Sequence, residues 1–403
     1  MNKEIPKFQE WPIWTEDDVE AVANVIRSGK WWCGAPMDHA GEQVWKFQDE
    51  FANFLGVKHS FACTNGTHAI EIALMALEIG SGDEVIVSDW TFLASGSAVV
   101  AVNAVPIFCD IDPKTFLMDP NLLESLINER TKAIICVHLG GMPCEMDRIM
   151  EIAQKYNLKV IEDCAHAHGS KYKGKCVGAW GDCGTFSFQA SKVLTAGEGG
   201  AIVCNDDLLA EKIYSVLDSG RKPGKWFYDH YIYGSDFRMP ELAAALLRVQ
   251  LKRYPEQLKK RNENAIYLSQ KLSEIPGVHP QKKIEGVEVC ANYVYPVYFD
   301  PEFFRGIGYR KMYEELEKAK IPIDACYPPL HSLDLFKNIK LMPNVDYSNA
   351  NWGGKKSDPE NFPIIEKIHA NAFELEHCVL LSDKKALDYI VETIKCIQIK
   401  YSK

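Results

Sequence analysis

The sequence lacks several features that would place it in particular classes of protein. It has no uninterrupted apolar run near the roughly 18 residues that a membrane span requires, so no membrane partner is expected. It has no cluster of lysine and arginine, and its formal net charge of −10 argues against nucleic acid as a partner. The first residues, MNKEIPKFQEWPIW, contain no basic segment followed by an apolar core, so no secretory signal is expected.

The 13 cysteines are scattered along the chain and include no C-x-x-C pair. An odd number without metal-ligand spacing favours reduced thiols in a cytosolic protein over a disulfide framework or a zinc site. We therefore predict a cytoplasmic protein without a metal centre. A length of 403 residues exceeds what a single hydrophobic core usually serves, so two domains are predicted.

Short apolar runs alternate with helical patterns between residues 60 and 205. The strand-like runs are Ser60 to Cys63, Glu84 to Val87, Val105 to Cys109, Ala133 to His138, Val160 to Asp163, Thr185 to Phe188 and Ala201 to Cys204. This alternation predicts an α/β fold with a mostly parallel, seven-stranded sheet flanked by helices. Two helices are expected between residues 11 and 56, the first starting after Thr15 and ending near Gly29, the second starting near Ala40. We place the large domain at 1–255 and a smaller α+β domain at 256–403.

Ligands of such sheets gather at the carboxyl ends of the strands, which directs attention to the residues after each run. Thr64-Asn65-Gly66-Thr67 leads into a helix whose free N–H groups suit a phosphate, although this turn taken alone favours a simple capped turn. Asp89-Trp90-Thr91-Phe92 places aromatic rings after the second run. Asp163 ends the fifth run and is followed by His166 and His168, which could be metal ligands in a loop but face apart in a helix.

The stretch 185–200, TFSFQASKVLTAGEGG, is the centre of the pattern. It alternates polar and aromatic residues as a strand does, and then Lys192 leads into a glycine-rich turn. Lys192 is either the first exposed residue after a core strand or a functional lysine. A phosphate cradle, an aromatic ring, a buried acid and a lysine at one sheet edge are the parts that a pyridoxal phosphate site needs.

Five stretches carry a resemblance to a known family: TNGTHAIEIALMAL at 64–77, GDEVIVSDWTF at 82–92, IEDCAHAHGSKYKGKCVG at 161–178, FSFQASKVLTAGEGGAIV at 186–203 and GSDFRMPELAAALLRVQL at 234–251. The chain resembles the DegT/DnrJ/StrS aminotransferases, which are pyridoxal phosphate enzymes of fold type I that act on sugars and cyclitols. WPIW at 11–14, SGKWW at 28–32 and LTAGEGGA are most similar to the aminocyclitol branch. That branch includes glutamine:scyllo-inosose aminotransferases and 3-amino-5-hydroxybenzoate synthases.

The resemblance implies a role for each matching position. Lys192 is the implied Schiff-base lysine and Asp163 the partner of the pyridine nitrogen, and a lysine at 192 favours transamination over dehydration. The other implied cofactor residues are His166 near the ring oxygen, Phe92 as the stacking aromatic with Trp90 as an alternative, and Gly66, Thr67 and Ser187 at the phosphate.

One position departs from the family pattern. The family has asparagine in G-x-N-x-R, which reaches the cofactor phosphate from the partner subunit of a homodimer with shared sites, whereas this chain has Asp236. Because a carboxylate and a phosphate repel, we expect Asp236 to turn toward a neighbouring cation, either Arg238 or Arg221.

The substrate side is less specific. Trp31 and Trp32 form either a hydrophobic plug or a lid, and Tyr327 and His331 match the family's substrate-side positions or belong to a proline-rich connector. Arg221 and Arg238 are either a carboxylate clamp or structural residues at a dimer interface.

The resemblance implies ping-pong transfer of an amino group from glutamine or glutamate to a keto-cyclitol or keto-sugar. A nucleotide-linked keto-sugar aminotransferase, a 3-amino-5-hydroxybenzoate synthase-like enzyme and a non-catalytic regulator that binds the cofactor are the alternatives.

Overall fold

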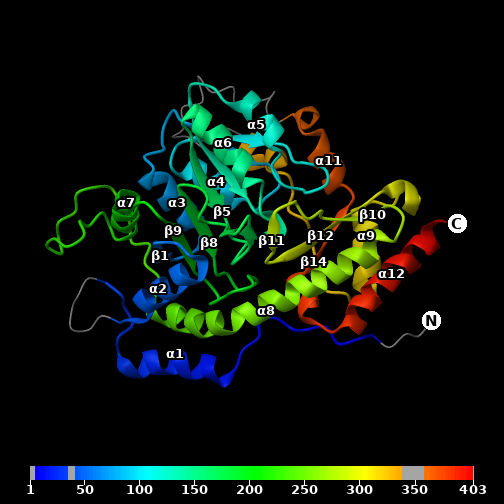
Figure 1. Ribbon diagram of the computed structural model, residues 1–403, viewed down its shortest axis with the longest axis horizontal. Coiled ribbons are helices and arrows are strands. Elements are labelled where there is room, and N and C mark those ends of the chain that lie inside the picture. Colours follow the sequence, from blue (N-terminus) through cyan, green and yellow to red (C-terminus); the bar gives the residue numbers. More distant parts are fainter. Residues whose placement is uncertain (1–4, 35–40, 338–357, 403) are drawn as a thin grey trace.

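A seven-stranded sheet forms the centre of the protein. The computed structural model describes residues 5–34, 41–337 and 358–402 (Figure 1). The strand order is β1-β9-β8-β5-β4-β2-β3. The strands are β1 (His59–Cys63), β2 (Glu84–Ser88), β3 (Val105–Cys109), β4 (Thr131–Val137), β5 (Lys159–Asp163), β8 (Cys183–Ser187) and β9 (Gly200–Cys204). All seven predicted runs are therefore confirmed, with end shifts of at most two residues.

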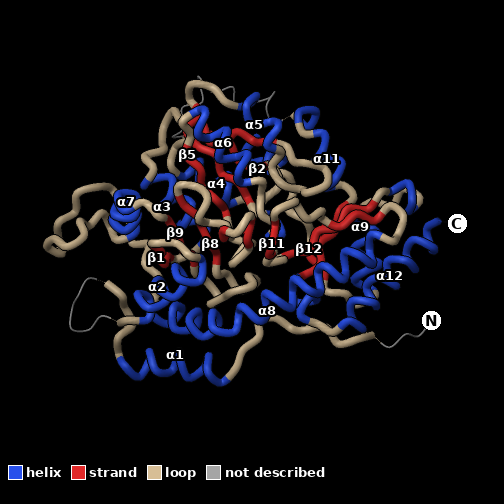
Figure 2. The backbone as a smooth tube through the Cα atoms, viewed as in Figure 1, coloured by secondary structure: helices blue, strands red, loops and turns tan. Residues whose placement is uncertain are grey.

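The sheet is mostly parallel, as predicted. The pairs β2–β3, β2–β4, β4–β5 and β5–β8 are parallel, whereas β9 is antiparallel to both β1 and β8, so only β9 runs against the other strands. Every residue of β2, β3 and β8 is buried, which requires cover on both faces. That cover comes from helices that surround the strands in Figure 2: α3 (Gly66–Ala76), α4 (Ala94–Ala101), α5 (Pro120–Leu126), α6 (Met146–Tyr156) and α7 (Asp207–Leu217).

Two N-terminal helices precede the sheet. Helix α1 (Glu16–Ser28) begins after Thr15, whose backbone N–H bonds the Asp18 carboxylate at 2.7 Å, and it ends at Gly29, where φ is +67°. Helix α2 (Gln43–Leu55) begins at Gln43, slightly later than expected. Both helices pack against the first half of α8 (Glu241–Ser273).

A smaller antiparallel sheet forms the C-terminal part, in the order β10-β12-β14-β13. Its strands are β10 (Val278–Pro280), β12 (Val294–Phe299), β13 (Ile323–Asp324) and β14 (Ala372–Glu376), packed with α9 (Tyr309–Lys318), α12 (Lys384–Ser402) and the end of α8. A third sheet joins β11 (Val287–Val289), β6 (Lys171–Tyr172) and β7 (Lys175–Cys176). The predicted division at residue 255 falls on Pro255, inside α8, and remains a prediction.

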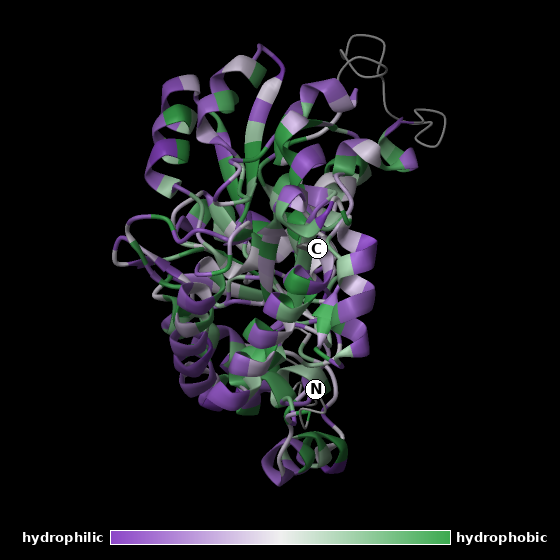
Figure 3. Ribbon diagram, turned by 90° about the vertical axis from the view of Figure 1, so that its right-hand side faces the viewer, coloured by the Kyte–Doolittle hydropathy of each residue, from purple (hydrophilic) through white to green (hydrophobic). Residues whose placement is uncertain are grey.

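The remaining short elements connect these parts. They are η1 (Leu139–Gly141), η2 (Pro301–Phe304), η3 (Leu330–Ser332), α10 (Asp334–Lys337), η5 (Pro359–Asn361), α11 (Pro363–His369) and η6 (His377–Leu381). Helices show hydrophilic outer faces and hydrophobic inner faces in Figure 3, the pattern of an amphipathic cover. Within the described ranges, no helix is both long and apolar enough to cross a membrane.

Candidate active site

A cavity of about 710 Å³ opens at the carboxyl ends of the parallel strands. Its wall combines the N-terminus of α3, the ends of β5 and β8, the loop after β8 and the start of β12. The seven residues predicted to bind the cofactor within one subunit all line it: Gly66, Thr67, Phe92, Asp163, His166, Ser187 and Lys192. The fold thus brings together residues that are spread over 126 positions of the sequence, from 66 to 192.

Lys192 is buried in this wall, with 8% of its surface exposed. Its Nζ atom lies 4.0 Å from the ring centroid of Tyr293. Burial lowers the pKa of Lys192 to about 8, although the negative charges of Asp163 and Glu374 oppose that shift. An appreciable share of the amine is therefore neutral near pH 7, which is the form that acts as a nucleophile or a base. The reading of Lys192 as an exposed residue after a core strand is wrong.

Asp163 ends β5 and is held in place by two donors. Its Oδ2 accepts a hydrogen bond from the Ser95 hydroxyl at 2.7 Å, and its Oδ1 accepts one from the Ala165 N–H at 3.1 Å. A carboxylate oriented in this way and buried can hold a protonated ring nitrogen. Ser95 was not predicted from the sequence, because a serine inside α4 carries no local signal of this contact.

The turn before α3 has the geometry of a phosphate cradle. The Asn65 side chain caps the helix by accepting a hydrogen bond from the His68 N–H at 2.8 Å. A Cβ atom at Gly66 would lie 2.7 Å from the Cβ of Ser187, so only glycine lets the turn approach the end of β8 this closely. The helix N-terminus and the hydroxyls of Thr67 and Ser187 together form a donor set that suits a phosphate. The residues present fit the phosphate of a pyridoxal cofactor.

Phe92 supplies the aromatic surface. It is 52% exposed, and its ring lies 5.6 Å from that of Tyr327. Trp90, the alternative, is fully buried against Phe116 and donates its indole N–H to the Tyr327 carbonyl at 3.0 Å. Trp90 is therefore part of the core, and Phe92 is the ring that faces the cavity.

His166 lies between two tyrosines of the C-terminal part. Its ring centroid is 4.2 Å from that of Tyr293, and its Nε2 lies 3.4 Å from the Tyr327 hydroxyl. Its Nδ1 accepts the Gly140 N–H at 3.3 Å. Burial, followed by the positive charge of Lys192, lowers the pKa of His166 well below its usual value. The imidazole is therefore neutral.

Two residues near Lys192 were not revealed by the sequence: Tyr293, which lines the cavity, and Glu374, whose charge acts on Lys192. Glu374 is buried on β14, and its Oε1 has no hydrogen-bond partner among the described residues. Burial, followed by repulsion from Asp324, raises the pKa of Glu374 to about 8, while Lys192 opposes this shift. Both residues follow Lys192 by more than 100 positions, and no local motif marks them.

Tyr327 and His331, both predicted to face the substrate, lie in different environments. Tyr327 lines the cavity, whereas His331 is buried outside it. The His331 Nδ1 lies 2.5 Å from the Asp89 carboxylate and its Nε2 lies 3.0 Å from that of Glu366. Its ring stacks on Phe362 at a centroid distance of 4.2 Å. These contacts give His331 a structural place between β2 and α11.

The tryptophan loop and Arg221 also lie away from this subunit's cavity wall. Trp31 is exposed, and Trp32 packs against Phe227 with its ring under the Arg238 guanidinium, 5.5 Å away. Arg221 bonds Asp218 at 2.7 Å. None of the three is among the described residues that line the cavity.

Asp236 is turned toward Arg238, as predicted. Its Oδ2 accepts a hydrogen bond from the Arg238 Nη2 at 2.6 Å, and its side chain is 63% exposed. Arg238 also bonds Asp218 at 2.5 Å. The carboxylate therefore has its cation within its own subunit.

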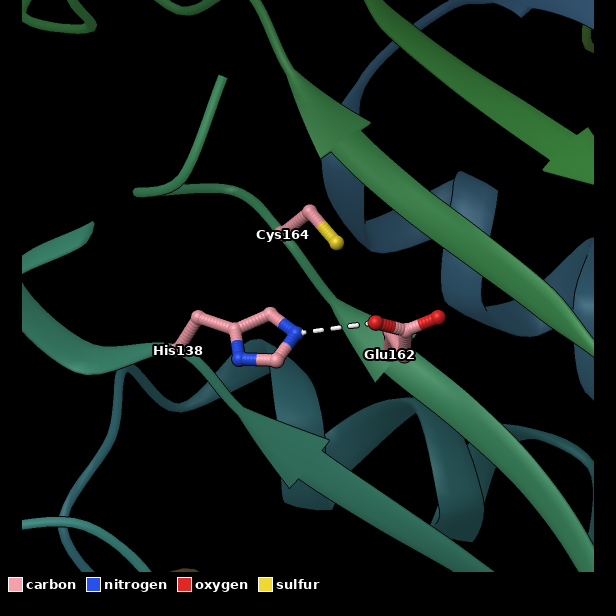
Figure 4. Close-up of side chains that lie close together, drawn as sticks. All are labelled: His138, Glu162 and Cys164. Carbon is pink, nitrogen blue, oxygen red and sulfur yellow. Dashed lines mark hydrogen bonds and ion pairs between the residues drawn. The ribbon is translucent and has the colours of Figure 1, made fainter. Parts of the chain in front are cut away.

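The histidines after β5 do not form a metal site with Asp163. The Nε2 of His168 donates to the Ser187 carbonyl at 2.9 Å, and burial lowers the pKa of His168 to about 3. Another buried group, His138, Glu162 and Cys164, has ligand atoms within 4.8 Å of one another (Figure 4). However, Glu162 already accepts hydrogen bonds from the His138 Nε2 and from the backbone N–H groups of Gly178, Trp180 and Gly181. The cluster is a satisfied hydrogen-bond network that fixes the end of β5.

The sheet, the buried lysine and the opposing acid define an α/β enzyme that transfers nitrogenous groups. The chain belongs to the DegT/DnrJ/EryC1/StrS aminotransferase family, whose profile matches residues 12–395. The predicted resemblance is thus confirmed, and the protein is an aminotransferase.

Three comparisons illustrate the range of its relatives. The chain is 40% identical over 389 residues to L-glutamine:2-deoxy-scyllo-inosose aminotransferase of Streptomyces lividus, covering 92% of this chain and 90% of that protein. It is 46% identical over 237 residues to GDP-perosamine synthase of Caulobacter vibrioides, covering 58% of this chain and 63% of that protein. The crystal structure of 3-amino-5-hydroxybenzoic acid synthase superposes with a TM-score of 0.88 at 31% identity, covering 98% of this chain and 100% of that one.

Proposed function

We propose that this aminotransferase moves an amino group from glutamine or glutamate to a keto-cyclitol, using pyridoxal phosphate. The observation that carries the proposal is Lys192, buried in the wall of a cavity that Asp163 also lines, with a pKa lowered to about 8. The relatives that cover most of the chain and are named for 2-deoxy-scyllo-inosose support a cyclitol acceptor.

Each part of the cofactor has a candidate partner among the residues that line the cavity. The helix N-terminus at Gly66 and Thr67, with Ser187, would hold the phosphate, and Phe92 would cover one face of the ring. Asp163 would hold the ring nitrogen in its protonated form. When bound, pyridoxal phosphate supplies an electron sink that stabilises a carbanion at the donor's α-carbon.

The chain's own groups then bind the reactants and move the proton. As a neutral amine, the Lys192 Nζ would move the proton from the donor's α-carbon to the cofactor in the first half-reaction, and from the cofactor to the acceptor's carbon in the second. Because the Nδ1 of neutral His166 accepts the Gly140 N–H, its Nε2 carries the proton and can donate one hydrogen bond without adding charge to the cavity. Tyr327 and Tyr293 present hydroxyl groups suited to the hydroxyls of a cyclitol.

We further propose a cytoplasmic homodimer with shared active sites. Trp32 and Arg221 lie away from their own cavity and contact Phe227, in a loop whose exposed aromatic rings a partner surface would cover. The exposed aromatic residues of that loop are Trp226, Tyr228 and Tyr233. All 13 cysteines are free thiols, as a reducing compartment requires.

A nucleotide-linked keto-sugar is the second candidate acceptor, because the match to GDP-perosamine synthase has 46% identity over 237 residues. The test is to incubate the purified enzyme with glutamine and either 2-deoxy-scyllo-inosose or a GDP-linked 4-keto-sugar, and to identify the aminated product by mass spectrometry. We expect the amino-cyclitol, and no product with Lys192→Ala. Amination of the GDP-sugar alone would replace the proposed acceptor with the second candidate.

A further inference from the structure

Two side chains from distant parts of the chain hold the backbone immediately before Lys192. The indole N–H of Trp11 donates to the Ala190 carbonyl at 3.1 Å, and the imidazole Nε2 of His377 donates to the Ser191 carbonyl at 3.0 Å. Trp11 precedes α1 and His377 begins η6, directly after β14. The loop after β8 is therefore fixed by both ends of the sequence.

A buried arginine selects the form of His377 that makes this bond. The Nη2 of Arg261, on α8, lies 3.2 Å from the Nδ1 of His377. A guanidinium can only donate, so Nδ1 must accept and the ring proton must sit on Nε2, which faces Ser191. Burial, followed by the charge of Arg261, lowers the pKa of His377 well below its usual value, so the imidazole stays neutral.

Burying the charged guanidinium of Arg261 lowers the free energy of unfolding of the protein. It is fully buried, and its Nε and Nη1 have no hydrogen-bond partner in the part of the chain that the structure describes. Its guanidinium lies 5.3 Å from the ring of Trp11 and 5.9 Å from that of Tyr254, and burial lowers its pKa to about 10. An apolar side chain of similar volume would give a more stable fold at such a position. Stability alone therefore does not account for Arg261.

We infer that Arg261 and His377 are positioning residues for Lys192. Arg261 fixes the tautomer of His377, and His377 fixes the Ser191 carbonyl. That carbonyl belongs to the peptide bond that joins Ser191 to Lys192. The inference rests on the proposed role of Lys192. In that role its Nζ both holds the cofactor and moves a proton, so the backbone that carries the side chain has to stay in place. The rate of a proton transfer depends steeply on such placement, and an error of about 1 Å can cost about a hundredfold.

Two nearly matched substitutions test the His377 bond. In His377→Gln the side-chain amide nitrogen reaches the place of Nε2 and can still donate to the Ser191 carbonyl, whereas in His377→Asn it reaches only the place of Nδ1. For His377→Asn we expect the kcat of the half-reaction with the amino donor to fall about tenfold, equivalent to ~1.4 kcal/mol, with KM little changed. His377→Gln should stay within about threefold of the wild type, since one hydrogen bond is preserved.

Amide hydrogen exchange gives a second readout that does not need turnover. In the apoprotein, His377→Asn should accelerate exchange in peptides that cover residues 189–194, while peptides from β4 stay protected. His369→Asn, on α11, is the matched control and should change neither kcat nor exchange at 189–194. Equal behaviour of the Gln and Asn variants, or a uniform rise in exchange along the chain, would overturn the inference.

Arg261→Met separates positioning from stability. We expect its urea midpoint to equal or exceed that of the wild type while kcat falls, because the substitution removes a buried charge but frees the tautomer of His377. A midpoint that falls in parallel with kcat would show that Arg261 only stabilises the fold. Activity in Lys192→Ala would instead refute the proposed function, which keeps the two failures distinct.

Discussion

Replacing Lys192 with methionine should stabilise the apoprotein near neutral pH. The pKa of Lys192 is lowered from 10.5 to about 8 in the folded protein, so the unfolded chain binds this proton more tightly than the folded one. The native state is therefore penalised at and below pH 8, and it recovers stability as the pH rises from 8 to 10.5. Methionine keeps the length and flexibility of the side chain but has no charge to desolvate.

The size of the effect follows from the two pKa values. The difference between 10.5 and about 8, at about 1.4 kcal/mol per pH unit, gives roughly 3 kcal/mol at pH 7. At pH 9.5 Lys192 is still mostly protonated in the unfolded chain but mostly neutral in the folded protein, so about 1.4 kcal/mol of the penalty should remain. The gap between Lys192→Met and the wild type should therefore narrow by about half over this range.

The assay is equilibrium urea unfolding of cofactor-free protein at one fixed concentration, repeated from pH 7 to pH 9.5. Lys260→Met, on an exposed position of α8, controls for the loss of a solvated lysine. A Lys192→Met protein less stable than the wild type at pH 7 would refute the reasoning. A stability gain that does not change with pH would refute it as well, because the gain would then come from packing.

Three further substitutions test the assigned places of residues in and around the site. Asp236→Asn should leave the Kd of pyridoxal phosphate unchanged or slightly lower, because the carboxylate already faces Arg238. The Kd is measured by fluorescence titration of the apoprotein, and a large rise would show that the carboxylate itself is needed. His331→Leu should lower the free energy of unfolding by about 3 kcal/mol and leave substrate KM unchanged, since it removes the partner of the buried Asp89 carboxylate. A raised KM at unchanged stability would restore its substrate role. Phe92→Ala should weaken cofactor binding by about tenfold, because one aromatic contact contributes ~1 kcal/mol beyond its buried area. An unchanged Kd in the same titration would show that Phe92 does not contact the cofactor ring.

The large sheet could be predicted from the sequence because buried parallel strands are short continuous apolar runs with helical patterns between them. The same periodicity located the ligand side of the sheet, since Asp163, Ser187 and Gly66 each lie at a strand end or directly after one. The local sequence therefore predicts both the strand and the residue at which it ends. That is why residues predicted from strand ends line one cavity in the structure.

The rest of the site depends on packing between distant elements. Tyr293 directly precedes β12 and Glu374 lies on β14, so their approach to Lys192 follows only from how the C-terminal sheet packs against the large one. His331 shows the converse, because it is four positions from Tyr327 yet turns away with η3 to bond Asp89. Neither contact has a periodicity, a spacing or a motif by which a sequence could reveal it.

Helix α8 has a mechanical consequence for how the two sheets can move. Its 33 residues extend about 50 Å, with the first turns packed on α1 and α2 and the last on β10, η6 and α12. One continuous helix thus connects the parts of the protein that contain the two sheets. It restricts their relative motion more than a flexible linker would. Pro255 interrupts the backbone hydrogen bonds near the middle of the helix, which makes it the place where flexing costs least. A change in the angle between the two halves of α8 would therefore concentrate at Pro255, and it would shift the C-terminal sheet relative to the large one.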